Sequence, residues 1–140
     1  EKASFLKENL LPMQESGQLH FVNRKEGSFL EKSELGFGIH FVDGHTDKQM
    51  IPIINYRGKT LVFVADLLPT AGHVPLPFVM GYDTRPLITL REKKAFLEEA
   101  ANKGYYLFLE HDAHNEIIDL KHTEKGVRHH NTYTFKELFN

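Results

Sequence analysis

Hydrophobic residues gather along the chain in short runs whose spacing predicts a sheet. Runs rich in β-branched and aromatic residues, bounded by polar or glycine-containing turns, are typical of strands. We expect strands at residues 19–22, 28–31, 38–42, 48–56, 59–65, 105–109, 116–121 and 127–133, followed by a short helix at 135–139. The pair Arg57-Gly58 separates two of these runs and indicates a tight hairpin turn.

Two longer segments have their apolar residues at helical spacing. The clearer one covers residues 89–103, where Thr89 and Glu92 have the spacing of a capping box. Residues 4–16 predict a second helix, which we expect Pro12 to break or restart. The helix at 89–103 has an apolar stripe and is expected to cover one face of the sheet.

The segment 69–86, between the central strands and the clearer helix, holds four of the six prolines. A loop of this length is uncommon in a compact domain and is usually functional or disordered. Its many apolar residues argue against disorder. We therefore expect this segment to form a packed lid or one wall of a pocket.

Composition limits the class of protein. At 140 residues, with 41% hydrophobic and 26% charged residues, the chain is expected to be one globular domain spanning 1–140. A net charge of −2 gives no electrostatic signature for nucleic acid, and no apolar run is long enough to span a membrane. Without cysteine there are no disulfides, which leaves the compartment open, with the cytoplasm slightly favoured.

Three hydrophobic runs end at or near residues that bind metals in proteins. Asp66 directly follows such a run, and His45 and His111 each follow another. A carboxylate next to core residues is costly to bury unless a cation or hydrogen bonds compensate. Imidazole and carboxylate groups are ligands that zinc accepts. The trio therefore predicts a metal site, in preference to turn histidines and a solvated acidic loop.

Four further residues have weaker claims to the same site. Asp43 and Asp112 could orient the histidine near them or could be turn residues, and neither alternative is favoured. His73 could reach a substrate from the long loop, and Tyr82 could donate a hydrogen bond to one, although packing is the favoured role of both. We assign the histidines after His111 to the surface or the sheet: His114, His122, His129 and His130.

The order Gly44-His45-Thr46, then Ala-Asp-Leu-Leu-Pro-Thr at 65–70, then Glu110-His111-Asp112 resembles the second half of the metallo-β-lactamase-fold hydrolases. The likeness is closest to the branch with bacterial lactonases and organophosphate or methyl parathion hydrolases, and it covers the chain from about Ser4 onward. It implies an α+β fold, half of an αββα sandwich with a mostly antiparallel or mixed sheet and flanking helices.

The resemblance also implies a metal centre with two ions, usually zinc. His45 would complete the ligand set of the first ion, Asp66 would bridge both ions, and His111 would bind the second. The family's His-x-His-x-Asp-His cluster, however, has no match in this chain. Three ligands spread over two ions are too few, since a catalytic zinc normally takes three protein ligands by itself.

Two hypotheses about function follow. In the first, the chain is the carboxyl-terminal half of a hydrolase that cleaves a lactone, ester, amide or phosphotriester by metal-bound hydroxide, and it is inactive alone. In the second, it is a non-catalytic module that acts as an interaction or structural domain. Either way, the missing half would leave an apolar sheet face uncovered. We expect a homodimer, swapped elements, or association with the missing amino-terminal half, and a small-molecule substrate.

Overall fold

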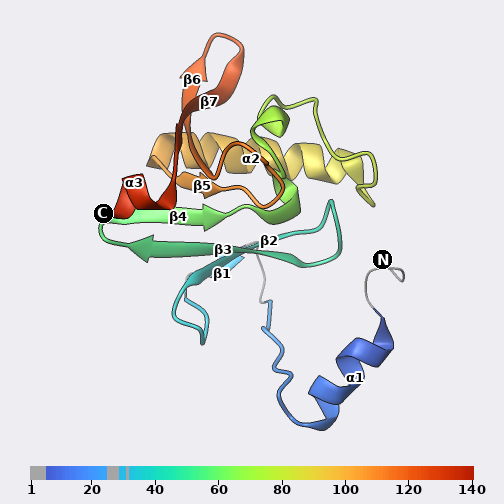
Figure 1. Cartoon of the computed structure of the whole chain (residues 1–140). Coiled ribbons are helices and arrows are strands. Elements are labelled where there is room, and N and C mark those ends of the chain that lie inside the picture. Colours follow the sequence, from blue (N-terminus) through green and yellow to red (C-terminus); the bar gives the residue numbers. More distant parts are fainter. Residues whose placement is uncertain (1–5, 25–28, 31) are drawn as a thin grey trace.

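The computed structural model describes residues 6–24, 29–30 and 32–140. One seven-stranded sheet dominates this part of the chain, with a long helix across one face (Figure 1). The strands follow one another in chain order from the first to the seventh. Neighbours are antiparallel, apart from the fourth and fifth strands, which are parallel and are joined by the long helix.

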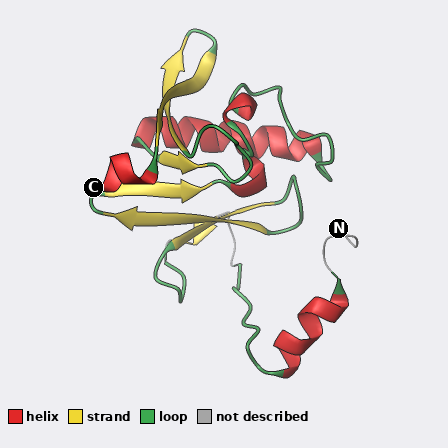
Figure 2. Ribbon diagram, in the orientation of Figure 1, coloured by secondary structure: helices red, strands yellow, loops and turns green. Residues whose placement is uncertain are grey.

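The order of helices and strands confirms the predicted α+β class (Figure 2). The elements are α1 (Lys7–Glu15), β1 (Phe29–Leu30), β2 (Gly38–Val42), β3 (Gln49–Tyr56), β4 (Lys59–Phe63), the 3₁₀ turns η1 (Ala65–Leu67) and η2 (Ala71–His73), α2 (Pro86–Lys103), β5 (Tyr106–Phe108), β6 (Ile117–Thr123), β7 (Gly126–Tyr133) and α3 (Phe135–Phe139). None of the described helices is long and apolar enough to cross a membrane.

The hydrophobic core lies between the sheet and α2. Alternate residues of each strand point to this side, and helix residues such as Phe96 and Leu97 pack against them. Five neighbouring strands each place a completely buried side chain in this core: Val42, Ile51, Val62, Leu107 and Ile118. Because side chains on a strand alternate between faces, the residues between them point to the opposite face.

That opposite face is apolar and is only partly covered by described residues: Ile39, Phe41 and Ile117 are buried on it, whereas other side chains are not. At one end Phe139 of α3 packs against Tyr56, with 5.2 Å between the ring centroids. At the other end the Arg24 guanidinium lies over the ring of Phe41. On the same face Met50, the cross-strand partner of Phe41, is 48% exposed, and Ile54 is 37% exposed. The described part of the chain thus has a partly uncovered apolar face, as expected for half of a sandwich.

The β3–β4 hairpin turns where the sequence predicts it. Arg57 and Gly58 both have positive φ, 48° and 76°, which is the backbone of a type I′ turn. A predicted strand at 19–22, by contrast, is wrong, because these residues pair with no neighbouring strand and Phe21 is 81% exposed. The predicted strand 28–31 forms as β1, although residues 28 and 31 lie outside the described part.

Both long helices differ from the sequence-based expectation at one point. Pro12 lies inside α1 without breaking it. All residues of this helix are exposed, so water can satisfy the carbonyl group that proline cannot bond. Helix α2 begins at Pro86 rather than at Thr89, since proline is well suited to the first helical position. The predicted capping box of Thr89 and Glu92 is therefore wrong; Thr89 is buried inside the helix.

Candidate metal centre

Asp66 lies between His45 and His111, the other two residues of the predicted metal-binding trio. Its Oδ2 atom is 3.5 Å from His45 Nε2, and its Oδ1 atom is 3.1 Å from His111 Nε2. Each histidine therefore faces a different oxygen of the same carboxylate. A carboxylate placed in this way could share a metal ion with either histidine. The structure thus brings together all three predicted ligands.

The parallel pair β4 and β5 explains why Asp66 and His111 meet. Phe63 and Phe108 are partners at the carboxyl ends of these strands, so the residues that follow them emerge at the same edge of the sheet. Just beyond β4, Ala65 has a positive φ of 43°, a conformation that costs energy for a residue with a side chain. This turn sets the position of Asp66, one residue later.

His45 is held by Asp83, a residue outside the predicted set. Its Nδ1 atom lies 2.8 Å from Asp83 Oδ1, and the Asp83 side chain is completely buried. A carboxylate at Nδ1 keeps the proton on that nitrogen, which leaves the Nε2 lone pair facing Asp66 for a metal. Asp83 lies in the long loop 69–86, where no local pattern marks it.

Two buried oxygen atoms, on residues that contact His45 or Asp66, have no hydrogen-bond partner in the described part of the chain. One is Asp83 Oδ2, and the other is Gln49 Oε1, whose Nε2 atom lies 3.4 Å from Asp66 Oδ2. Buried polar atoms almost always have a partner, and unpaired ones mark places where a ligand, ion or water completes the site. Such orphans around an acid flanked by two imidazoles fit a cation-binding site.

Glu110 adds a fourth possible ligand. Its carboxylate, Asp66 and His111 each offer a donor atom, and these three atoms lie within 4.8 Å of one another. In the sequence Glu110 stands out only as the neighbour of His111, because nothing local distinguishes a ligand from a solvated acid. With His45 the site offers two imidazoles and two carboxylates, a donor set that suits zinc.

Asp43 and Asp112 organise loops around the site. Asp43 forms a salt bridge of 2.8 Å with Arg24 and accepts a hydrogen bond from Lys48 N. Partial burial alone would raise the pKa of Asp43, but these partners lower it overall. Asp112 accepts a bond from Ala71 N at 2.9 Å and further bonds from His114 and Asn115, which together outweigh burial and lower its pKa to about 2. Among the described residues, the hydrogen bonds of both carboxylates go to backbone amides and to the Arg24 or Asn115 side chain, and neither carboxylate is paired with His45 or His111.

His73 and Tyr82 line an open cleft beside His111. The cleft has a volume of about 300 Å³ and is formed by Pro69, Thr70, His73, Val79, Met80, Gly81, Tyr82 and His111. The segment 69–86 thus supplies a pocket wall, as its composition predicts.

The two predicted residues in this wall have different surroundings. Burial, and the charge of Lys93, lower the pKa of His73, whose Nδ1 lies 2.8 Å from Thr70 Oγ1. The favoured core role of Tyr82 is wrong, since it is 74% exposed and its ring meets His45 edge-on.

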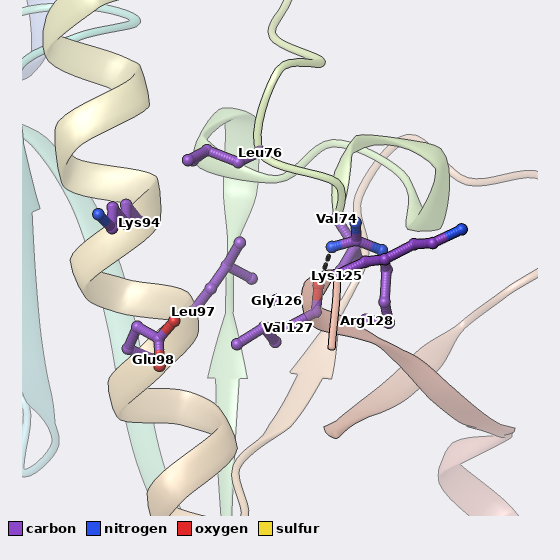
Figure 3. Close-up of a pocket in the computed structure, with 9 residues that line it drawn as sticks. All are labelled: Val74, Leu76, Lys94, Leu97, Glu98, Lys125, Gly126, Val127 and Arg128. Carbon is purple, nitrogen blue, oxygen red and sulfur yellow. Dashed lines mark hydrogen bonds between the residues drawn. The ribbon is translucent and has the colours of Figure 1, made fainter. Parts of the chain in front are cut away.

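A second cleft lies between α2 and the β6–β7 hairpin and is separate from the candidate centre. It is about 160 Å³ in volume and shares no lining residue with the cleft beside His111. Leu97 of α2 points toward Val127 of the hairpin, and the Lys125 side chain extends outward (Figure 3). The buried Val74, Leu97 and Val127 are part of the hydrophobic core, so this cleft marks where the hairpin packs on the helix.

Comparison with known proteins gives matches in structure. No protein-family model matches the chain, and no curated protein matches it in sequence. A probable metal-dependent hydrolase from Staphylococcus aureus is similar with a TM-score of 0.66 and 20% identity, over 85% of this chain and 42% of that one. The dizinc quorum-quenching lactonase AidC is similar with a TM-score of 0.68 and 20% identity, over 96% of this chain and 47% of that one.

A third similar structure is the hydrolase AbOPH of the β-lactamase superfamily, with a TM-score of 0.68 and 15% identity, over 91% of this chain and 43% of that one. The chain thus spans less than half the length of each of these proteins. At identities this low, the TM-scores establish the fold alone. They confirm that the chain has the predicted architecture, the carboxyl-terminal half of a metallo-β-lactamase sandwich.

Proposed function

We propose that this chain carries one half of the active site of a metal-dependent hydrolase. The observation that carries the proposal is the position of Asp66, whose two carboxylate oxygens face His45 and His111. The fold supports it, because the structural neighbours are described as a metal-dependent hydrolase, a dizinc lactonase and a hydrolase. In this proposal the rest of the ligand set comes from outside the chain.

His45, Asp66 and His111 would hold the metal, with Glu110 as an additional carboxylate ligand. Zinc is the metal we expect, because it takes imidazole nitrogen and carboxylate oxygen. When bound, it would lower the pKa of a coordinated water toward about 7 and polarise the oxygen of the bond to be cleaved. The negative charge of Asp66 would offset repulsion between two such cations.

The other residues of the site have supporting roles in this proposal. Asp83 holds His45 in one tautomer and one orientation, which is the usual function of a carboxylate behind a metal-binding histidine. The cleft wall around His73 and Tyr82 would receive the substrate next to His111. Asp112 fixes the loop that follows His111 by tying it to Ala71.

The substrate class we propose is a small molecule with a lactone, ester, amide or phosphotriester group. The lactonase among the neighbours is in complex with a small product, N-hexanoyl-L-homoserine, which favours a lactone. The apolar side chains of Val79 and Met80 in the cleft wall would suit an apolar substituent on such a molecule. The chain alone is expected to be inactive, since it holds too few ligands for two metals.

A second function is favoured by a different observation, the uncovered apolar face that includes Met50 and Ile54. A surface of this kind marks an interaction site. If the chain binds no metal, we expect it to act through this face as a structural or interaction module.

Metal content per chain after dialysis against zinc separates the two functions. The first predicts bound zinc in the wild-type chain and a clear loss in Asp66→Asn, which removes the shared carboxylate charge and keeps the size of the side chain. Equal zinc content in both chains, or none in the wild type, would refute the first function.

A further inference from the structure

Glu92 makes contacts that its place on a helix does not require. From the second turn of α2 its carboxylate reaches the loop after β2. Oε1 accepts a hydrogen bond from Asp43 N at 2.8 Å, and Oε2 accepts one from Gly44 N at 3.0 Å. Two consecutive backbone N–H groups, directly before His45, thus bind one carboxylate. Hydrogen bonds to an ionised acceptor are among the strongest in proteins.

Gly44 shows independently that this loop lies directly on the helix. A Cβ atom added to Gly44 would lie 2.6 Å from Thr89 Cα and closer still to the Thr89 amide nitrogen and hydroxyl oxygen. No side chain fits between them. Thr89 is one turn before Glu92, so the close approach and the two hydrogen bonds lie on the same stretch of helix.

The carbonyl groups of the loop are held from the same side. Arg85 N donates to Gly44 O at 2.8 Å, and Arg85 Nε donates to Asp43 O at 2.9 Å. Thr84 N donates to His45 O at 3.1 Å. The start of α2 therefore holds both the donors and the acceptors of the backbone that carries His45.

We propose that Glu92 is a positioning residue for the candidate metal centre. By binding the N–H groups of Asp43 and Gly44 it sets the backbone from which His45 reaches toward Asp66. This inference rests on the proposed function, because it takes His45 as a metal ligand. Without the carboxylate, both N–H groups would be left unpaired against the helix, and the loop would shift to find other partners.

The test compares Glu92→Gln with Glu98→Gln in the full chain. Glutamine keeps the size of Glu92, but its NH₂ group cannot accept a hydrogen bond, so one of the two N–H groups loses its partner. Glu98 is an exposed residue of the same helix and serves as the matched control. Zinc affinity is measured by competition with a chromophoric chelator.

We expect zinc affinity to fall about 10-fold or more in Glu92→Gln, as is usual when a residue supporting a metal ligand is lost. Glu98→Gln should stay within about 2-fold of the wild type. Backbone exchange gives a second readout: the Asp43 and Gly44 amides should exchange at least about 10-fold faster in Glu92→Gln, while Leu107 in the core is unchanged.

The outcomes separate this inference from the proposed function. If the wild type binds zinc and Glu92→Gln binds it equally well, Glu92 does not position the site, even if the loop amides exchange faster. If the wild type binds no zinc, the proposed function fails, and the role of Glu92 fails with it. Should Glu92→Gln not fold, Glu92→Asp, which keeps the charge but shortens the reach, is tested by the same criteria.

Discussion

Gly44 lies so close to Thr89 that even a methyl group on Gly44 would overlap the helix backbone. Gly44→Ala should therefore destabilise the chain by about 1–3 kcal/mol, the usual cost of overpacking a filled site. Gly81→Ala is the matched control, because a Cβ at Gly81 would meet no atom within 4 Å. The measurement is the free energy of unfolding in urea. Equal values for the two variants would contradict the close approach.

Asp83→Asn should weaken zinc binding through His45. The asparagine keeps the shape of the buried side chain but removes the carboxylate that lies 2.8 Å from His45 Nδ1. Loss of such a support typically costs about 10–100-fold in metal affinity. Glu124→Gln, in the exposed turn between β6 and β7, is the control. Competition with a chelator measures the zinc affinity of both variants. An Asp83→Asn chain with the zinc affinity of the wild type would show that Asp83 does not support the site.

Lys93 should make stability depend on pH in the alkaline range. Its side chain is completely buried, and Nζ donates to the carbonyl groups of His73, Pro75 and Phe78. Burial lowers its pKa from the usual 10.5 to about 8, against a smaller opposing effect of Asp83. Between these two values the unfolded chain binds more protons than the folded one, so stability rises with pH.

The expected gain from Lys93 across this window is about 3 kcal/mol, at about 1.4 kcal/mol for each unit of pKa. The unfolding free energy of Lys93→Met should lack this rise, since methionine does not titrate. Lys94→Met, at the exposed neighbouring position, should retain it. Measurements between pH 7 and pH 10 decide the matter: if the curves of the wild type and Lys93→Met run parallel, Lys93 does not titrate in this range.

The uncovered face of the sheet should make the isolated chain self-associate. Met50 and Ile54 are exposed on it, and apolar surface of this kind is rarely left open in a stable monomer. We expect an average mass in light scattering that rises with concentration, and a shift toward the monomer in Ile54→Lys. Glu124→Lys adds a positive charge away from this face and should leave the average mass unchanged. A wild-type chain that stays monomeric at all concentrations would overturn this expectation.

Local pattern was sufficient to predict most of the sheet and to single out three residues that lie together in the structure. Gly38–Val42 forms β2 as predicted, and the hairpin at Arg57 turns as its sequence indicates. His45, Asp66 and His111 could be predicted because each follows a hydrophobic run, and strand ends gather at one edge of a sheet. These signals are contained in short stretches of sequence.

The supporting residues of the site could not be predicted in the same way. Asp83 and Gln49 reach the site from a loop and from the start of a strand, and their positions depend on how separate elements pack. Glu92 shows the difference most clearly. Its spacing from Thr89 is typical of a capping box, but the helix begins earlier, and the carboxylate binds a loop 48 residues away in sequence.

The most direct test of the central claim is to locate zinc in crystals of the chain by anomalous scattering at the zinc edge. The account predicts a peak bonded to Asp66 and to His45 or His111, because these residues already face one another across a single carboxylate. A peak only at surface histidines such as His122, which lies beside Glu98, or no peak at Asp66, would contradict it.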